Sequence, residues 1–325
     1  MRKINWGVLG TAGIAKGCTI PGMQQAENCN LYAIAGRSLK KAETFREAFG
    51  FIKAYGSYEA LLADPEVEAV YIPLPNELHV QWAMEAMKAK KHVLCEKPLA
   101  PSPALIEKLF ACARENGVVL MEAFAYLHSP FMAAIKQELK AGAIGNVLYM
   151  ESEFITSDYD LSNIRMRKET YGGALYDLGC YCTSQILWML EEEPEHIQAI
   201  AEFSQEGIDT YTTALLRFPS GKKACLQCGM VLATEKNHRI DRLRIHGTDG
   251  CIYTDVRFNM DGELSYIVET ESGKKVKTIS TPHNYRLEVE QLGRCIDGSE
   301  TPHVSNSFTL QNARLMEKIL NCIHY

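Results

Sequence analysis

The feature that most constrains the fold is a short apolar strand followed at once by a glycine loop. The run Ile4–Leu9 precedes Gly10-Thr11-Ala12-Gly13-Ile14-Ala15, a Gly-x-Gly-x-x-Gly pattern with alanine at its second and third glycine positions. Such a loop turns tightly at the first glycine and opens a helix whose N–H groups bind a pyrophosphate. A plain strand-to-helix turn is the alternative. The residues expected to contact a dinucleotide here are Gly10, Thr11, Ala12, Gly13 and Ile14.

Short apolar runs alternate with amphipathic stretches over residues 1–122. This alternation predicts right-handed crossovers and a doubly wound parallel sheet, so the chain is of the α/β class with an N-terminal Rossmann domain at 1–122. The expected strands are Ile4–Leu9, Leu31–Ala35, Ala69–Ile72, His92–Cys95 and Val118–Met121. The expected helices are Ala42–Phe49, Leu78–Ala89 and Pro103–Asn116.

After a helical stretch at Pro130–Ala141, longer strand-like runs dominate and turn residues separate several of them. They predict an α+β domain over residues 123–325, with a large open, mostly antiparallel sheet. The expected strands are Val147–Ile155, Ile197–Phe203, Thr210–Phe218, Ala224–Leu232, Arg242–His246 and Leu264–Val268. The expected helices are Gly173–Leu190, Tyr285–Cys295 and Leu310–Ile323.

Charge and cysteine content exclude several classes of function. A formal net charge of −6 argues against nucleic-acid and anionic-membrane partners, which need a basic face. No run of about 18 apolar residues is present, and no export signal precedes the first strand, so a cytoplasmic protein with reduced thiols is expected. Cys225-x-x-Cys228 has metal-ligand spacing but no second ligand pair, so we expect no metal.

The end of the second expected strand indicates which dinucleotide binds. An acidic residue there would accept hydrogen bonds from a free ribose 2′-hydroxyl and repel a 2′-phosphate. No Asp or Glu occurs there; Arg37, Ser38 and Lys41 follow instead, which suit a phosphate dianion. NADP(H) is therefore preferred, with NAD(H) as the second choice, unless Arg37 only solvates the strand end.

Four segments together resemble one family. These are the loop Gly10–Ala15, the segment Pro73–His79, the triplet Glu96-Lys97-Pro98, and the stretch from Gly172 to Tyr181. The chain resembles the Gfo/Idh/MocA oxidoreductases over nearly its whole length. Many inositol dehydrogenase-like members carry His at the position of Tyr181. This tyrosine makes the chain similar to the branch of dimeric dihydrodiol dehydrogenase, NADP-dependent xylose dehydrogenase and glucose-fructose oxidoreductase.

Lys97 is the main catalytic candidate. It follows the strand His92–Cys95, at the carboxyl end where ligands of open α/β sheets gather, and a partly desolvated ammonium can donate and accept protons. The alternative is an ordinary surface lysine. Whether the Lys97–Pro98 bond is cis is open at this point.

Asp177 and Tyr181 lie four residues apart on an expected helix and so share one face. The resemblance implies that Lys97 and Tyr181 lie near the substrate hydroxyl and that Asp177 binds or orients the substrate. A tyrosine has an ordinary pKa near 10, so a cationic neighbour such as Lys97 is needed for proton transfer near neutrality. A buried Tyr181 and a helix-capping Asp177 are the alternative.

Other positions carry weaker indications. Pro73, Asn76, His79 and Glu96 are expected near the cofactor, although Asn76 and His79 fit a helix start equally well. The resemblance implies substrate contacts for Tyr126 and Arg165. Glu122 and His128 lie in the same stretch as Tyr126, after the expected strand Val118–Met121. Tyr285 and Glu288, near the C-terminus, are further candidates near the cleft.

These features predict hydride transfer between NADP(H) and a hydroxyl or carbonyl of a sugar, polyol or diol. Two alternatives stay open: a cofactor-dependent glycoside-processing enzyme, and a noncatalytic dinucleotide sensor, since a fold alone does not fix function. The resemblance also implies a homodimer or higher homo-oligomer formed through the open sheet. The substrate itself has no signature in the sequence.

Overall fold

The chain divides into two compact units in the computed structural model, which describes residues 2–157, 162–232 and 239–325. The first unit comprises Met1–His128 with Pro282–Leu310, and the second comprises Ser129–Thr281 with Gln311–Tyr325. The expected boundary after residue 122 lies close to His128. The expected single domain at 123–325 differs from the structure, because residues 282–310 return to the first unit.

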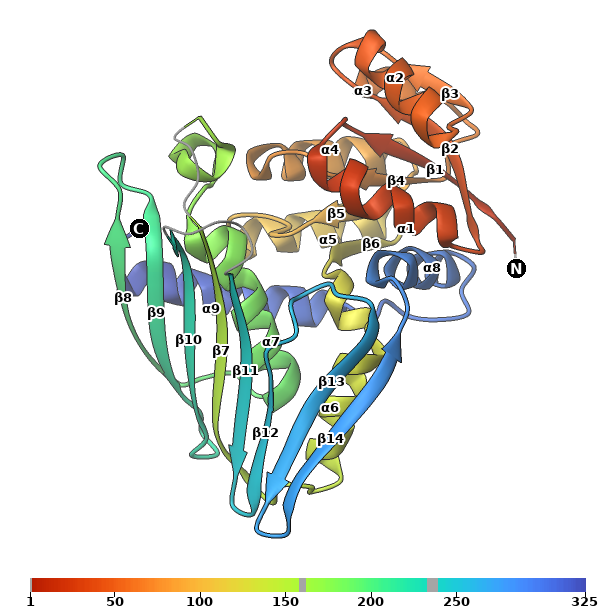
Figure 1. Cartoon of the computed structure of the whole chain (residues 1–325). Coiled ribbons are helices and arrows are strands. Elements are labelled where there is room, and N and C mark those ends of the chain that lie inside the picture. Colours follow the sequence, from red (N-terminus) through yellow and green to blue (C-terminus); the bar gives the residue numbers. More distant parts are fainter. Residues whose placement is uncertain (1, 158–161, 233–238) are drawn as a thin grey trace. The chain divides into compact units, whose positions relative to one another are not determined.

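The first unit contains a six-stranded parallel sheet in the order β3-β2-β1-β4-β5-β6 (Figure 1). All four residues of β4 are buried, as expected for a parallel strand covered on both faces. The strand order reverses between β1 and β4, and ligands of such sheets bind outside the carboxyl ends at this point. The strands are β1 (Ile4–Leu9), β2 (Cys29–Ala35), β3 (Lys53–Tyr55), β4 (Ala69–Ile72), β5 (His92–Glu96) and β6 (Leu120–Ala123).

Helices connect these strands, and a returning helix, α8, packs against α1. The first connection begins as a π-helical turn, η1, and continues as α1. The helices are η1 (Ala15–Thr19), α1 (Ile20–Gln25), α2 (Leu39–Phe49), α3 (Tyr58–Leu62), α4 (Asn76–Lys88), α5 (Pro103–Asn116), η2 (Ala125–His128) and α8 (Asn284–Ile296). The expected doubly wound α/β class is confirmed, while β3 and α3 were not predicted.

The second unit is built on an eight-stranded sheet in the order β14-β13-β12-β11-β7-β10-β9-β8. The pair β7–β10 is parallel and the other pairs are antiparallel, which confirms the mostly antiparallel sheet. The strands are β7 (Val147–Ser157), β8 (His196–Phe203), β9 (Asp209–Arg217), β10 (Lys223–Leu232), β11 (Ile240–Gly247), β12 (Gly250–Thr254), β13 (Gly262–Thr270) and β14 (Gly273–Thr281). Strands β12 and β14 were not predicted.

One face of this sheet is covered by helices, including α6 and α7 (Figure 1). Along β9, Ala214 and Leu216 are buried toward the helices, whereas Leu215 between them is exposed on the outer face. The helices are α6 (Pro130–Lys140), η3 (Ile164–Met166), η4 (Lys168–Thr170), η5 (Leu175–Gly179), α7 (Cys180–Leu190) and α9 (Asn306–Cys322), the last of which begins in the first unit. Within the described ranges, no helix has the length and apolar character needed to cross a membrane.

Candidate active site

The glycine loop after β1 is open to solvent on its outer side. Gly10 has a φ of 123°, which favours glycine, and its N–H donates to the Ala35 carbonyl at 2.8 Å. Gly13 and Ile14 are exposed, and no atom lies within 4 Å of where a Cβ of Gly13 would sit. Because Lys16 N–H donates to the Ala12 carbonyl at 3.0 Å, the N–H groups just before Lys16 have no acceptor within the helix. The loop therefore has the space and the donors to hold a pyrophosphate.

The end of β2 carries an exposed basic group. Arg37, Ser38 and Lys41 are exposed, and no side-chain partner is found for them among the described residues. Ser38 is the N-cap residue of α2. Burial raises the pKa of Tyr58, and the positive charge of Arg37 opposes this shift, which places Arg37 near the Tyr58 ring. The Tyr58 hydroxyl lies 3.9 Å from the ideal Cβ position of Gly10, so the basic group and the loop border the same surface.

Lys97 lies in a turn that His79 braces. It is half-buried directly after β5, and the bond from Lys97 to Pro98 is cis. The buried ring of His79 places Nδ1 at 2.9 Å from the Pro98 carbonyl and Nε2 at 2.7 Å from the Leu74 carbonyl. Burial lowers the pKa of His79. A neutral imidazole has one N–H and donates to only one of these carbonyls, and the ring lies between the turn after β4 and the turn that carries Lys97.

Two carboxyl groups flank the Lys97 turn. Glu96 accepts a hydrogen bond from the buried Tyr71 hydroxyl, which itself accepts one from Thr19 at 2.8 Å. Glu122 Oε1 accepts from the Leu99 N–H at 2.8 Å. Burial raises the pKa of Glu122 to about 7, and the positive charge of Lys97 opposes that shift.

Asp177 and Tyr181 stand in the second unit at the junction of η5 and α7. Asp177 lies in the π-helical turn η5 and pairs with Arg165, whose Nε lies 2.6 Å from Asp177 Oδ2. The side chain of Arg165 is 37% exposed, so its guanidinium also faces solvent. The ion pair joins Asp177 to the expected substrate residue Arg165 and shows that Asp177 does more than cap a helix.

Tyr181 is set in an aromatic cluster. Its ring centroid lies 5.4 Å from that of Phe154 and 5.1 Å from that of Phe258. Asn259, which has a left-handed φ of 61°, directs its Nδ2 to the Tyr181 hydroxyl at 3.5 Å. Tyr181 is half-buried, so its hydroxyl has a fixed surrounding without being sealed in the core.

Several weaker candidates lie deeper than a contact residue would. Tyr126 is 2% exposed and packs its ring against Phe124. Tyr285 and Glu288 on α8 are also buried. Pro73 is buried, whereas Asn76 is half-buried at the first position of α4.

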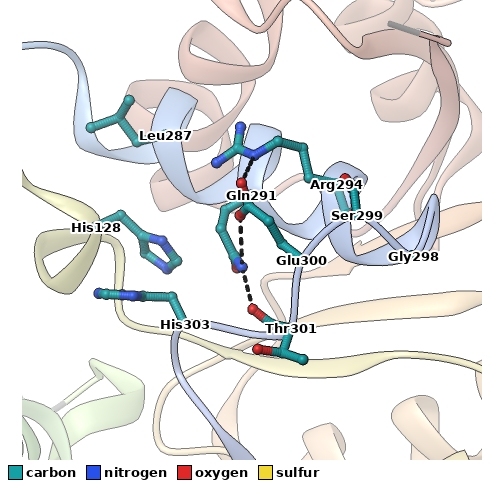
Figure 2. A pocket seen from close by; sticks show the side chains of 9 residues that line it. All are labelled: His128, Leu287, Gln291, Arg294, Gly298, Ser299, Glu300, Thr301 and His303. Carbon is teal, nitrogen blue, oxygen red and sulfur yellow. Dashed lines mark hydrogen bonds and ion pairs between the residues drawn. The ribbon is translucent and has the colours of Figure 1, made fainter.

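His128 faces a different pocket of the first unit, shown in Figure 2. Its ring centroid lies 5.2 Å from that of His303, and burial lowers its pKa to about 3. Across this pocket Arg294 Nε donates to Glu300 at 2.6 Å, and Gln291 Nε2 donates to the Thr301 carbonyl at 2.8 Å.

Three contributors had not been expected from the sequence. Tyr71 is the only hydroxyl-bearing residue in the buried strand β4. A hydroxyl in an otherwise apolar strand can be recognised in the sequence and suggests a polar partner nearby. Thr19 and Asn259 have no comparable signal, because their contacts lie 52 and 78 residues away in the chain. The cysteines of Cys225-x-x-Cys228 lie three apart on β10 and therefore point to opposite faces of the sheet.

Comparison with known proteins places the chain in a family. Residues 4–124 match the oxidoreductase family with an NAD-binding Rossmann fold, and residues 132–253 match the GFO/IDH/MocA C-terminal domain. A D-xylose 1-dehydrogenase (NADP(+)) of Haloferax volcanii is 34% identical, over 97% of this chain and 95% of that protein. A trans-1,2-dihydrobenzene-1,2-diol dehydrogenase of Xenopus laevis is 31% identical, over 97% and 96%.

A solved structure is similar over the full fold. It is the 3-ketoreductase KijD10 of Actinomadura kijaniata in complex with NADP and TDP-benzene, with a TM-score of 0.93, 28% identity, and coverage of 99% of this chain and 98% of that one. The resemblance inferred from the four sequence segments is thereby confirmed. The chain belongs to the Gfo/Idh/MocA family of NAD(P)-dependent oxidoreductases.

Proposed function

We propose that this protein transfers hydride between NADP(H) and a hydroxyl or carbonyl group of a sugar, polyol or diol. The observation that carries the proposal is Lys97, half-buried at the carboxyl end of β5 in a turn braced by His79 and flanked by Glu96 and Glu122. Relatives named as an NADP-dependent xylose dehydrogenase, a diol dehydrogenase and a sugar ketoreductase support the substrate class.

The residues after β1 and β2 fit NADP(H). The N–H groups of Gly13, Ile14 and Ala15, which precede the first intrahelical bond, suit the pyrophosphate, as does the loop at Thr11 and Ala12, and Arg37 with Ser38 and Lys41 suits a 2′-phosphate. Pro73, Asn76 and Glu96 are proposed to border the nicotinamide end. His79 contributes by packing between the Leu74 and Pro98 carbonyls, because neither of its ring nitrogens is left to contact the cofactor. When bound, NADP(H) supplies or accepts the hydride.

Proton transfer is assigned to Lys97 and Tyr181. Oxidation of an alcohol needs a group that takes the hydroxyl proton, and reduction needs the same group to return it. The Asn259 Nδ2 group lies 3.5 Å from the Tyr181 hydroxyl and helps to hold it in place. The Asp177–Arg165 pair offers a carboxylate and a guanidinium for substrate hydroxyls. Tyr126 is proposed to support the substrate side of the site.

A spectrophotometric screen tests the function. Purified protein is mixed with NADP⁺ or NADPH and a panel of sugars, inositols, diols and dicarbonyls, and cofactor absorbance is followed. We expect substrate-dependent turnover that Lys97→Met lowers by about 10²–10⁴-fold, since general acid–base catalysis contributes that much. Lys88→Ala, at an exposed site on α4, is the control and should retain turnover. Tight cofactor binding without turnover of any substrate would contradict the proposal.

We also infer a cytoplasmic homodimer. All eleven cysteines are free, which is typical of a reducing compartment. On the outer face of the large sheet, Ile200 is 71% exposed and Leu215 is 57% exposed. Exposed aliphatic side chains on a broad sheet favour burial against a second copy.

A further inference from the structure

The side chain of Glu288 is buried without a partner. It lies on α8 with no exposed surface, and neither carboxyl oxygen has a hydrogen-bond partner among the described residues. Burial raises its pKa well above the ordinary value, and the negative charge of Glu96 adds to the shift. Its buried position therefore favours the protonated form of the carboxyl group. Unpaired polar atoms in a core reduce stability, so an apolar side chain would serve packing better at this position.

Helix α8 is fixed against α1 and the segment after it, and the ideal Cβ position of Gly22 in α1 lies 2.8 Å from Tyr285 Cβ. Asn28 Nδ2 donates to the Glu290 carbonyl at 2.8 Å, and Glu27 N–H donates to the Glu290 carboxylate at 3.1 Å. Tyr285, one turn before Glu288, bonds to the Cys18 thiol of η1. Glu288 is thus held in the region where η1 and the end of β5 meet.

Glu96 is the acceptor that this region offers. Its carboxylate already accepts from Tyr71, and its charge acts on both Cys18 and Glu288. The titratable groups around Glu288 are therefore Cys18 of η1, Tyr71 of β4, Glu96 of β5 and Tyr285 of α8 itself. Of these, Glu96 alone carries a carboxyl group, and it directly precedes Lys97 in the chain.

We propose that Glu288 is a positioning residue that donates a hydrogen bond, through one buried water molecule, to the Glu96 carboxylate beside Lys97. A buried water needs two to four polar partners, which the carboxyl oxygens of Glu288 and Glu96 supply. The bond fixes the rotamer of Glu96 and, with it, the negative charge next to the Lys97 ammonium. The catalytic consequence rests on the function proposed above for Lys97.

Two variants separate this role from a packing role. Glu288→Met keeps the side-chain length without polar atoms, and Glu288→Gln keeps a donor. We expect Glu288→Met to lower kcat about 10-fold or more with an unchanged Kd for NADPH, because the variant lacks the donor to Glu96. Glu288→Gln should retain kcat within about 3-fold. Glu115→Met, at an exposed position of α5, is the control and should change neither Tm nor kcat.

Lysine labelling gives a readout that needs no substrate. Pulse acylation with acetic anhydride across a pH series, followed by peptide mass spectrometry, reports the pKa of Lys97, with exposed Lys88 as the internal reference. We expect the Lys97 profile to shift in Glu288→Met and to stay close to wild type in Glu288→Gln. A difference infrared spectrum of wild type against Glu288→Gln should contain the band of a protonated carboxyl group.

The outcomes distinguish the two proposals. An unshifted Lys97 profile in Glu288→Met, a Glu288→Gln variant as altered as Glu288→Met, or absence of the protonated-carboxyl band would each overturn the role of Glu288. Wild-type protein that turns over no substrate, with the labelling shift present, would overturn the proposed function alone.

Discussion

At the scale of single residues, the backbone on both sides of Lys97 is held by side chains from other strands and helices. Tyr71 bonds to Glu96, His79 meets the Pro98 carbonyl, and Glu122 accepts from the Leu99 N–H. These partners come from β4, α4 and β6. The arrangement explains how a short turn keeps a half-buried ammonium at a defined place.

Lys97 was predictable from the sequence, but its supports were only partly so. The Glu-Lys-Pro triplet after an apolar run is local, so strand position and motif suffice to identify it. The contacts of Tyr71, His79 and Glu122 span 25, 19 and 23 residues of chain, and such pairings depend on which strands lie side by side. Periodicity and composition carry no information about them.

Arg37→Ala tests the choice of cofactor. Loss of a charged hydrogen-bond donor to a phosphate costs about 1.5–3 kcal/mol, which corresponds to roughly 10–100-fold in KM for NADPH. The KM for NADH should change little, because that cofactor lacks the 2′-phosphate. Steady-state kinetics with both cofactors gives the comparison. Arg46→Ala, in the last turn of the following helix α2, is the matched control, and equal changes for both cofactors would refute the assignment.

Glu122 predicts a pH-dependent term in stability. Its pKa rises from 4.5 to about 7 on folding, so between these pH values the folded chain holds a proton that the unfolded chain has lost. The free energy of unfolding therefore falls as pH rises through this window, by about 3 kcal/mol. Glu122→Gln lacks this term, so its stability relative to wild type should increase by that amount from about pH 4 to about pH 8.

Urea denaturation at several pH values measures this difference. The exposed Glu115→Gln on α5 is the control for the loss of a carboxyl group as such. A stability difference between Glu122→Gln and wild type that stays constant across the pH window would show that Glu122 is not the group responsible.

At the scale of elements, two candidate site segments begin in a π-helical turn. η1 follows the dinucleotide loop, and η5 carries Asp177 immediately before the helix of Tyr181. π-Helical turns are rare in proteins, and those that do occur are often found at functional sites. Asp209 supports η5, since its Oδ2 accepts from the Leu175 N–H at 2.8 Å and from Thr212 at 2.9 Å.

Gly173→Ala tests this support. Gly173 has a φ of 115°, and an added Cβ would lie 2.0 Å from Asp209 Oδ1, so the methyl group must displace the carboxylate that holds η5. We expect a Tm loss and a fall in turnover of about 10-fold or more. Gly221→Ala also has a positive φ but meets no atom within 4 Å, and should cost only about 1–2 kcal/mol of backbone strain.

Thermal unfolding and kinetics of the two variants decide the matter. Equal losses in Gly173→Ala and Gly221→Ala would mean that backbone strain, and not the contact with Asp209, accounts for the effect.

Two of the strands that sequence reasoning missed, β3 and β14, lack a clear apolar pattern. β3 has three residues, none fully buried, so it has almost no pattern to detect. β14 is an edge strand, and most of its residues, including Lys274 and Lys275, are exposed. Lysines protect such an edge from pairing with other chains, and they also remove the apolar signal by which strands are recognised.

At the scale of the whole molecule, the outer face of the large sheet is expected to form the dimer. Leu215→Glu places a charge on this face, on the strand β9 next to the edge, and should convert a dimer into monomers in sedimentation equilibrium. Ile52→Glu changes an aliphatic residue of equal exposure, 57%, in the first unit and should leave the dimer intact. A monomeric wild type, or a dimer that survives Leu215→Glu, would contradict this assembly.

The central claim is that the protein itself moves hydride from NADPH to a carbonyl carbon. The most direct test uses NADPH with deuterium at the transferable C4 position and a carbonyl substrate found in the screen, with mass spectrometry of the alcohol product. We predict that deuterium moves to the product with wild-type protein and at a far lower rate with Lys97→Met. Deuterium that remains on the cofactor while the protein binds it tightly would contradict the account and favour a dinucleotide sensor.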